Sequence, residues 1–236
     1  FTEKEFLEEF REGVLVTPNV DHLMKLQRDR EFYEIYKRAD YVTVDSRIVK
    51  MALDFLGTPI REIIPGSGFF PSFYTYHKDN EDIKIFLLGA ASGIADLAMD
   101  KINRKVGRQI VVGAHSPSFG FEKNEDECEK IINQINASPA SVLVVGVGAP
   151  KQEKWIYKYK DRMPGIKIYL AIGATIDFEA GKIRRAPLIM QRLALEWLYR
   201  LWKEPKRLWR RYIVEDMPFF WLILKQKYGR YKNPFL

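Results

Sequence analysis

The sequence contains very little of what cross-links many small or metal-binding proteins. Cys128 is the one cysteine among 236 residues, and the three histidines are scattered along the chain. A single cysteine excludes a disulfide within the chain, and so few cysteines and histidines disfavour a structural zinc site. Cys128 lies in the charged segment NEDECEK, which predicts an exposed helix face and a poor setting for nucleophilic chemistry. We therefore expect no metal, no cofactor and a reducing, cytoplasmic setting.

Long apolar segments are also missing. The longest apolar run, 217–224, has eight residues, whereas a helix needs about 20 to span a bilayer. The chain begins without Met on FTEKEFLEEF, which is charged and amphipathic and unlike a signal peptide. We expect a helix there, on an N-terminus that has been trimmed. The apolar fraction of 47% predicts an ordered globular protein with a sizeable core.

The net charge of +7 is unevenly distributed along the chain. Residues 182–236 carry 14 Lys and Arg against 4 Asp and Glu, a balance of +10, which leaves −3 for residues 1–181. The same basic tail holds four of the five tryptophans. The sequence thus predicts two parts, a body over 1–181 and a helical appendage over 182–236.

The body reads as strand-then-helix units. Short β-rich runs alternate with segments of helical spacing, and Gly57 and Gly107 stand where helices are expected to stop. The β-rich runs are 13–20, 41–46, 83–92, 109–116, 141–148 and 166–175. This alternation predicts an α/β fold, a Rossmann-like and mostly parallel sheet with helices on both faces. Ligands of such sheets bind beyond the carboxyl ends of the strands.

The run VLVVGVGAPKQEKW joins a strand to a helix through a glycine turn. Lys151 stands where the dinucleotide fingerprint needs a third glycine, which disfavours a nicotinamide-dependent oxidoreductase, and the P-loop pattern is not met either. Gly148 and Lys151 at the start of a helix would suit a diphosphate, held by free N–H groups and a cation. A tight turn that binds nothing explains the glycines equally well.

Polar side chains also end the first two strands. Asp45 follows YVTV directly and would be placed to accept a proton from a hydroxyl, although Asp in this position often caps the next helix. Thr17 and Asn19 hold the corresponding place one unit earlier, where Asn19 is a candidate cap or a sugar-binding group.

The tail offers arginines among aromatic residues. Arg200, Arg207 and Arg210 would share one helical face if the helix continued past Pro205, although Pro205 is expected to break it. Arginine suits bidentate phosphate binding. Basic residues beside Trp and Tyr are typical of a helix in a membrane interface. A nucleic acid is the other polyanion such a tail would bind, but no known nucleic-acid module accompanies it.

Four motifs occur together in one order: VTPN, GVGAPKQEKW, IGATIDFEAGKIRRAP and LEWLYRLWKEPKR. On these, the chain from about Val14 to about Arg211 resembles the WecB/TagA/CpsF family of bacterial glycosyltransferases. The resemblance implies an inverting, metal-independent transfer of a sugar, N-acetylmannosamine or a related hexose, from a UDP-sugar to an undecaprenyl-diphosphate-linked sugar. It further implies a role in teichoic acid, capsule or exopolysaccharide synthesis, at the inner face of the cell membrane.

By position, the resemblance places the catalytic base at Asp45 and acceptor-pocket groups at Thr17 and Asn19. It also implies substrate-binding roles for residues of the loops and tail: Gly148, Lys151, Gln152, Asp177, Arg200, Arg207 and Arg210. The chain reads VDS around Asp45 where many relatives read PDG, and IIPGSGFF (63–70) also departs from the family pattern. These two segments are expected to be loops beside the sugar pocket, so the sugar and the acceptor are not fixed.

Two other functions compete with the transferase. A nucleic-acid-binding protein would use the tail and ignore UDP, with a steep dependence on salt. A sugar-nucleotide sensor would bind UDP-sugars without turnover. The apolar surface of the tail also favours self-association in the absence of a membrane.

Overall fold

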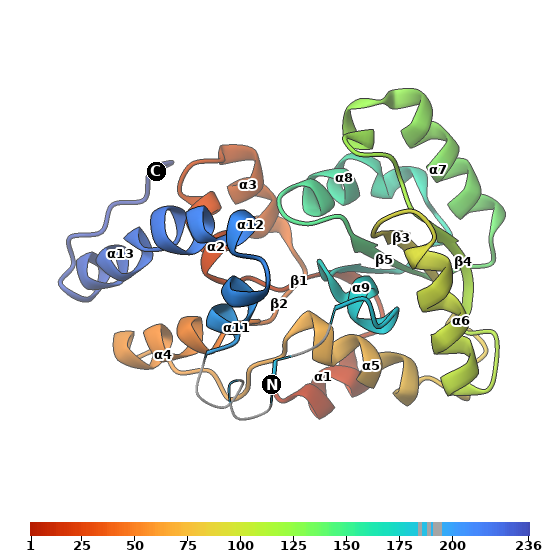
Figure 1. Cartoon of the computed structure of the whole chain (residues 1–236), viewed down its shortest axis with the longest axis horizontal. Helices are drawn as coiled ribbons and strands as arrows, with labels where there is room; N and C mark the ends of the chain where they lie inside the picture. Colours follow the sequence, from red (N-terminus) through yellow and green to blue (C-terminus); the bar gives the residue numbers. More distant parts are fainter. Residues whose placement is uncertain (184–185, 188–189, 191–194) are drawn as a thin grey trace.

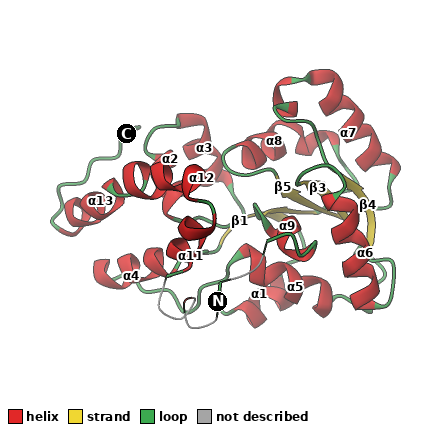
Figure 2. Ribbon diagram, viewed as in Figure 1, coloured by secondary structure: helices red, strands yellow, loops and turns green. Residues whose placement is uncertain are grey.

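The computed structural model describes residues 1–183, 186, 187, 190 and 195–236, with the side chain of Arg207 left out. A parallel six-stranded sheet lies at the centre of the body with helices on both faces (Figure 2). The strands are β1 Gly13–Val16, β2 Tyr41–Val42, β3 Ile85–Gly89, β4 Val111–His115, β5 Val142–Gly146 and β6 Ile168–Ala171. Their order across the sheet is β2-β1-β6-β5-β3-β4. The predicted fold class is confirmed.

The central strands are buried on both faces, because alternate side chains enter two separate cores. In β5, Val142 and Val144 belong to one core, whereas Leu143 and Val145 belong to the other. This is why these strands read as continuous apolar runs in the sequence and do not alternate with polar residues.

Helices from different parts of the chain cover each face (Figure 1). One face is covered by α1 Glu3–Glu9, α5 Gly66–Tyr76, α6 Ile94–Val106 and α9 Thr175–Glu179. The other is covered by α3 Arg30–Arg38, α7 Glu125–Ala137 and α8 Lys151–Tyr159. Short helical turns, η1 Phe121–Lys123 and η2 Lys160–Arg162, flank α7 and α8.

Two of these helices differ from the sequence predictions. Cys128 of α7 is fully buried, and its sulfur lies 3.3 Å from the indole nitrogen of Trp155. The expectation of an exposed cysteine is wrong because α7 turns this residue toward the sheet although its neighbours in sequence are charged. The segment 63–70, expected to be a loop, contains the start of α5, since Phe69, Phe70 and Phe73 are buried in the core.

The C-terminal segment runs back beside the first third of the chain. It contains α11 Glu196–Lys203, α12 Pro205–Trp209, the π-helical turn η3 Arg210–Glu215 and α13 Pro218–Lys227. Phe219 of α13 is buried against α2 Val20–Leu26 and α4 Arg47–Leu56, and Figure 1 shows these three helices together. The segment thereby reaches the edge of the sheet at which β1 and β2 end.

Candidate active site

The loops that follow β2, β1, β6 and β5 lie side by side, because these strands are neighbours and run in one direction. Asp45 and Thr17 lie in the first two of these loops, whereas Asp177 and Gln152 lie in the first turns of α9 and α8, which follow the other two. The backbone N–H of Asp45 donates to the carbonyl of Pro18 at 3.0 Å, which joins the loop after β2 to that after β1. The fold therefore gathers predicted residues that are far apart in the sequence.

Asp45 does not cap the helix that follows it. Ser46 is the N-cap of α4, and its hydroxyl accepts the backbone N–H of Val49 at 3.5 Å. No other described residue forms a hydrogen bond or an ion pair with the Asp45 carboxyl group. The capping alternative is thus excluded, and the carboxylate is left for another role.

The surroundings of Asp45 favour a proton acceptor that works near neutral pH. Burial raises the pKa of Asp45 to about 7, while the positive charges of Arg200 and Arg211 lower it and Glu196 raises it. All three of these charged residues belong to the C-terminal segment. A base with a pKa near the working pH combines a useful ionised fraction with a useful driving force for proton transfer.

Thr17 and Asn19 border the same edge of the sheet. Thr17 is buried and makes no side-chain hydrogen bond to any described residue. The side-chain oxygen of Asn19 caps α2 by accepting the backbone N–H of His22 at 3.2 Å. The cap takes up the amide oxygen of Asn19, which leaves its NH₂ group as the candidate contact for a ligand.

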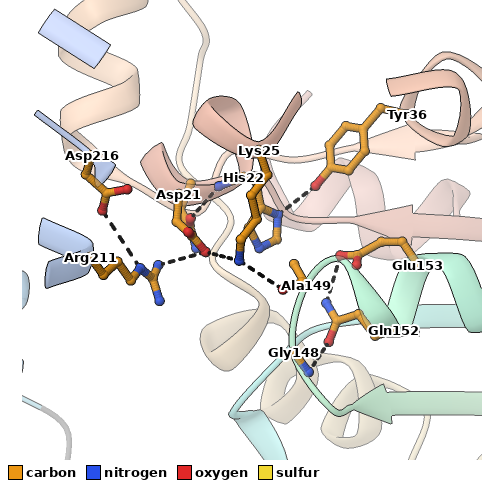
Figure 3. Close-up of polar contacts among 11 residues, drawn as sticks. Asp21, His22, Lys25, Tyr36, Gly148, Ala149, Gln152, Glu153, Arg211 and Asp216 are labelled. Atoms are coloured by element: carbon orange, nitrogen blue, oxygen red, sulfur yellow. Dashed lines mark hydrogen bonds and ion pairs between the residues drawn. The ribbon is translucent and has the colours of Figure 1, made fainter. Parts of the chain in front are cut away.

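The glycine turn before α8 is organised by Gln152. The side-chain oxygen of Gln152 accepts the backbone N–H groups of Gly148 at 3.2 Å and of Gly173 at 3.1 Å. Its NH₂ group donates to Glu153 at 2.9 Å (Figure 3). Gln152 is almost fully buried, and burial also raises the pKa of Glu153 to about 7. The Gln152 side chain therefore fastens the turn after β5 to the turn after β6.

Gly148 and Lys151 form the outer side of that turn. Gly148 has φ +84°, a left-handed backbone conformation that residues other than glycine rarely adopt. Lys151 is the first residue of α8, and its ammonium lies 5.2 Å from the centre of the Phe119 ring. Phe119 is fully exposed. A cation, a helix N-terminus and an uncovered aromatic ring are thus adjacent.

The tail arginines take different positions. Arg200 lies over the ring of Phe178, next to Asp177, with its guanidinium carbon 5.5 Å from the ring centre. The Arg210 side chain is mostly exposed and pairs with Glu215 at 3.4 Å. The side chain of Arg207 lies outside the described part of the structure. Pro205 does break the helix, since α11 ends at Lys203 and α12 begins at Pro205, so the condition for one shared arginine face is not met.

Sequence reasoning missed Arg211. It forms an ion pair with Asp21 at 3.4 Å and faces Asp216 at 3.8 Å. Its charge lowers the pKa of Asp45, whereas the exposed Arg210 pairs with Glu215. No spacing rule selects Arg211, because η3 is π-helical and its residues rotate by a smaller angle than in an α-helix.

Three further observations concern metal sites, membrane spans and exposed apolar side chains. Among the described residues, no three His, Cys, Asp or Glu side chains lie close enough to hold a metal ion. Within the same part of the chain, no helix is long and apolar enough to cross a membrane. The exposed apolar side chains concentrate in the C-terminal segment, among them Trp202, Trp209, Ile213, Phe220 and Trp221.

Comparison with known proteins identifies the family of the chain. A model of the glycosyl transferase WecG/TagA/CpsF family matches residues 2–233. The chain belongs to this family. It is therefore a glycosyltransferase, and the resemblance drawn from its motifs is confirmed.

Curated relatives of the family match most of the chain. A protein from Bacillus spizizenii is 27% identical over 209 residues, which cover 89% of this chain and 78% of the relative. Another, from Staphylococcus aureus (strain MRSA252), is 27% identical over 206 residues, 87% of this chain and 77% of the relative. Both are named N-acetylglucosaminyldiphosphoundecaprenol N-acetyl-beta-D-mannosaminyltransferase.

Proposed function

We propose that the protein transfers N-acetylmannosamine, or a related hexose, from a UDP-sugar to a sugar carried on undecaprenyl diphosphate. The acceptor follows the names of the relatives, which name a sugar carried on diphosphoundecaprenol. The observation that carries the proposal is the Asp45 carboxylate, which does not cap α4, is withdrawn from water and is subject to the positive charges of Arg200 and Arg211.

Asp45 would act as the general base of an inverting displacement. Its carboxylate takes the proton of the acceptor hydroxyl while that oxygen forms a bond to the anomeric carbon of the sugar. The bond between the anomeric carbon and the UDP oxygen breaks, and its electron pair leaves with UDP. A single displacement inverts the configuration, and the proton ends on Asp45.

The leaving diphosphate needs positive charge, and three parts of the site offer it. Arg200 and Arg211 lie on the side of the C-terminal segment, and Lys151 lies at the N-terminus of α8. Guanidinium groups and helix N-termini stabilise developing phosphate charge in other enzymes. On this basis we propose a transfer that does not depend on a divalent metal.

Phe119 supports a nucleotide donor. Its ring is fully exposed beside Lys151, and a flat aromatic ring of this kind can stack on a base. With the base on Phe119, the diphosphate would reach Lys151 at the N-terminus of α8.

The C-terminal segment supports a lipid-linked acceptor. Lys203 lies over Trp202 with its ammonium 5.2 Å from the ring, and Lys225 lies 5.6 Å from the ring of Trp221. Exposed aromatic rings with neighbouring cations bind the headgroup region of anionic bilayers. We propose that residues 182–236 form an appendage that holds the enzyme on the inner face of the cell membrane.

The test is product analysis with a panel of UDP-sugars and a short-chain lipid-diphosphate acceptor, with and without EDTA. We expect one hexosamine to be transferred, with inversion, at a rate that EDTA leaves unchanged. Asp45→Asn should slow transfer by about a factor of 10² to 10⁴ and keep UDP binding. Asp54→Asn, in the exposed pair with Lys50 on the same α4, should be neutral. Tight UDP binding with no transfer to any acceptor would instead identify a sugar-nucleotide sensor.

A further inference from the structure

Asp21 of α2 connects α2 with η3 directly and with the turn before α8 through Lys25. Its Oδ2 accepts a hydrogen bond from the Lys25 ammonium at 2.8 Å and pairs with Nη2 of Arg211 at 3.4 Å. The Lys25 ammonium also donates to the carbonyl of Ala149 at 2.9 Å. Figure 3 shows this chain of contacts running from η3 through α2 to the turn before α8.

This arrangement differs from an ordinary pair on a helix surface. An exposed Asp–Lys pair four residues apart contributes a few tenths of a kcal/mol. The Asp21 side chain, in contrast, is only 8% exposed. A carboxylate so far removed from water needs partners, and losing one of them leaves an uncompensated charge. Both partners of Asp21 connect to segments that are distant in the sequence.

The second acidic neighbour of Arg211 holds it less firmly. Asp216 lies 3.8 Å from Nε of Arg211, too far for a hydrogen bond. The Arg211 Nε atom and one oxygen of Asp216 are buried without a hydrogen-bond partner in the described structure. Asp21 is therefore the closer of the two acidic contacts that fix the guanidinium.

We propose that Asp21 is a positioning residue of the transferase. Through Arg211 it sets the place of the tail cation that acts on Asp45, and through Lys25 it sets the carbonyl of Ala149 beside Gly148. Asp21 thereby fixes the position of Arg211 relative to the turn that contains Gly148 and Ala149. The catalytic part of this inference rests on the proposed function, whereas the link between the tail and the turn does not.

The variant Asp21→Asn tests the link, because it keeps the shape of the side chain and removes the charge. Asp54→Asn is the matched control, an exposed partner in a Lys–Asp pair on α4. We expect kcat/KM to fall about 30-fold in Asp21→Asn, mostly through kcat, and to stay within about twofold in the control. Thermal unfolding of both variants shows whether the body remains folded.

A double-variant cycle separates positioning from a general loss of structure. If Asp21 acts largely through Arg211, Asp21→Asn should slow Arg211→Gln by only a few-fold, the part due to Lys25 and Ala149, and not by the roughly 30-fold expected in the wild type. Multiplying effects of the two substitutions would overturn the proposal. Lys25→Met keeps the Asp21–Arg211 pair but removes the hydrogen bond to Ala149. It should therefore weaken UDP binding and leave the C-terminal segment as resistant to trypsin as in the wild type. If Lys25→Met leaves UDP binding unchanged, the arm through Ala149 is wrong.

A second measurement does not depend on transferase activity. Trypsin cuts after Arg210 and Arg211, and Asp21→Asn should raise the rate of cleavage there about tenfold at unchanged melting temperature of the body. If Asp21→Asn is cleaved at the same rate as the Asp54→Asn control, Asp21 does not hold the C-terminal segment in place. Wild-type protein that transfers no sugar would refute the proposed function alone, since the cleavage rates would still decide the role of Asp21.

Discussion

Replacing Asp45 with Asn should make the protein more stable and nearly inactive at the same time. The pKa of Asp45 is raised by burial from 3.8 to about 7. In the unfolded chain the carboxyl group ionises at its ordinary pKa, so between about pH 4 and pH 7 the folded state holds more protons than the unfolded state. The free energy of unfolding must then fall as the pH rises through this window, and the loss is complete above it.

The size of the effect follows from the pKa difference. About three pKa units correspond to an upper limit of about 4 kcal/mol, at about 1.4 kcal/mol for each unit. Water reaches the partly exposed side chain, so we expect about 2 kcal/mol. Asn has no charge to desolvate. Asp45→Asn should therefore gain this amount at pH 8 and lose most of the gain by pH 4, which is close to the ordinary pKa of 3.8.

Urea unfolding of wild type and Asp45→Asn at pH 4 and pH 8 measures the difference in the free energy of unfolding. The transfer assay measures the loss of activity. Loss of a general base should slow transfer by about a factor of 10² to 10⁴, while the affinity for UDP changes little. Equal stabilities at pH 8 would refute the desolvated carboxylate. Transfer within a few-fold of wild type would refute its role as the base.

Three further predictions concern the groups around Asp45. Arg200→Gln should raise the pKa of Asp45 and move the acid limb of the kcat/KM profile to higher pH, whereas Glu196→Gln should move it to lower pH; shifts in one common direction would contradict this. Gln152→Leu should lower the free energy of unfolding by about 2 to 4 kcal/mol in urea titrations, because two backbone N–H groups and Glu153 lose their partner; the exposed Gln134→Leu is the control. Ending the chain near Lys182 should leave a folded body with a lower melting temperature, because Met24 and Val49 are no longer covered by Phe219. Its transferase activity should fall by about a hundredfold or more. Full activity would refute a role for the tail.

The sequence predicts the sheet well, for a physical reason. Strands buried on both faces must be apolar throughout, and the helices between them must present one apolar face. All six predicted β-rich runs contain a strand, although each strand is shorter than its run. The segment 66–76 was missed as a helix because glycine and Pro71 disfavour helix locally. Burial of its phenylalanines outweighs that preference, and only the folded core reveals this.

The candidate site was predictable in its place and less so in its parts. Strand ends selected Asp45, Thr17, Asn19 and the glycine turn, because parallel strands end at one edge. The sequence alone left Asp45 between a cap and a base, and the structure excludes the cap because the hydroxyl of Ser46 takes that place. Gln152 follows the expected turn, but its side chain forms hydrogen bonds with Gly148 and Glu153 of the protein itself. Such contacts join residues from two separate loops and leave no local pattern.

The amino-acid sequence by itself determined the α/β class, the edge of the sheet that holds the site, the basic aromatic tail and, through four motifs, the family. The tertiary structure alone decided which of the adjacent residues Arg210 and Arg211 acts on Asp45 together with Arg200. A π-helical turn and a buried carboxylate from α2 bring Arg211 inward and leave Arg210 exposed. Adjacent arginines are equivalent in the sequence, and they become different only when the chain folds and one of them meets Asp21.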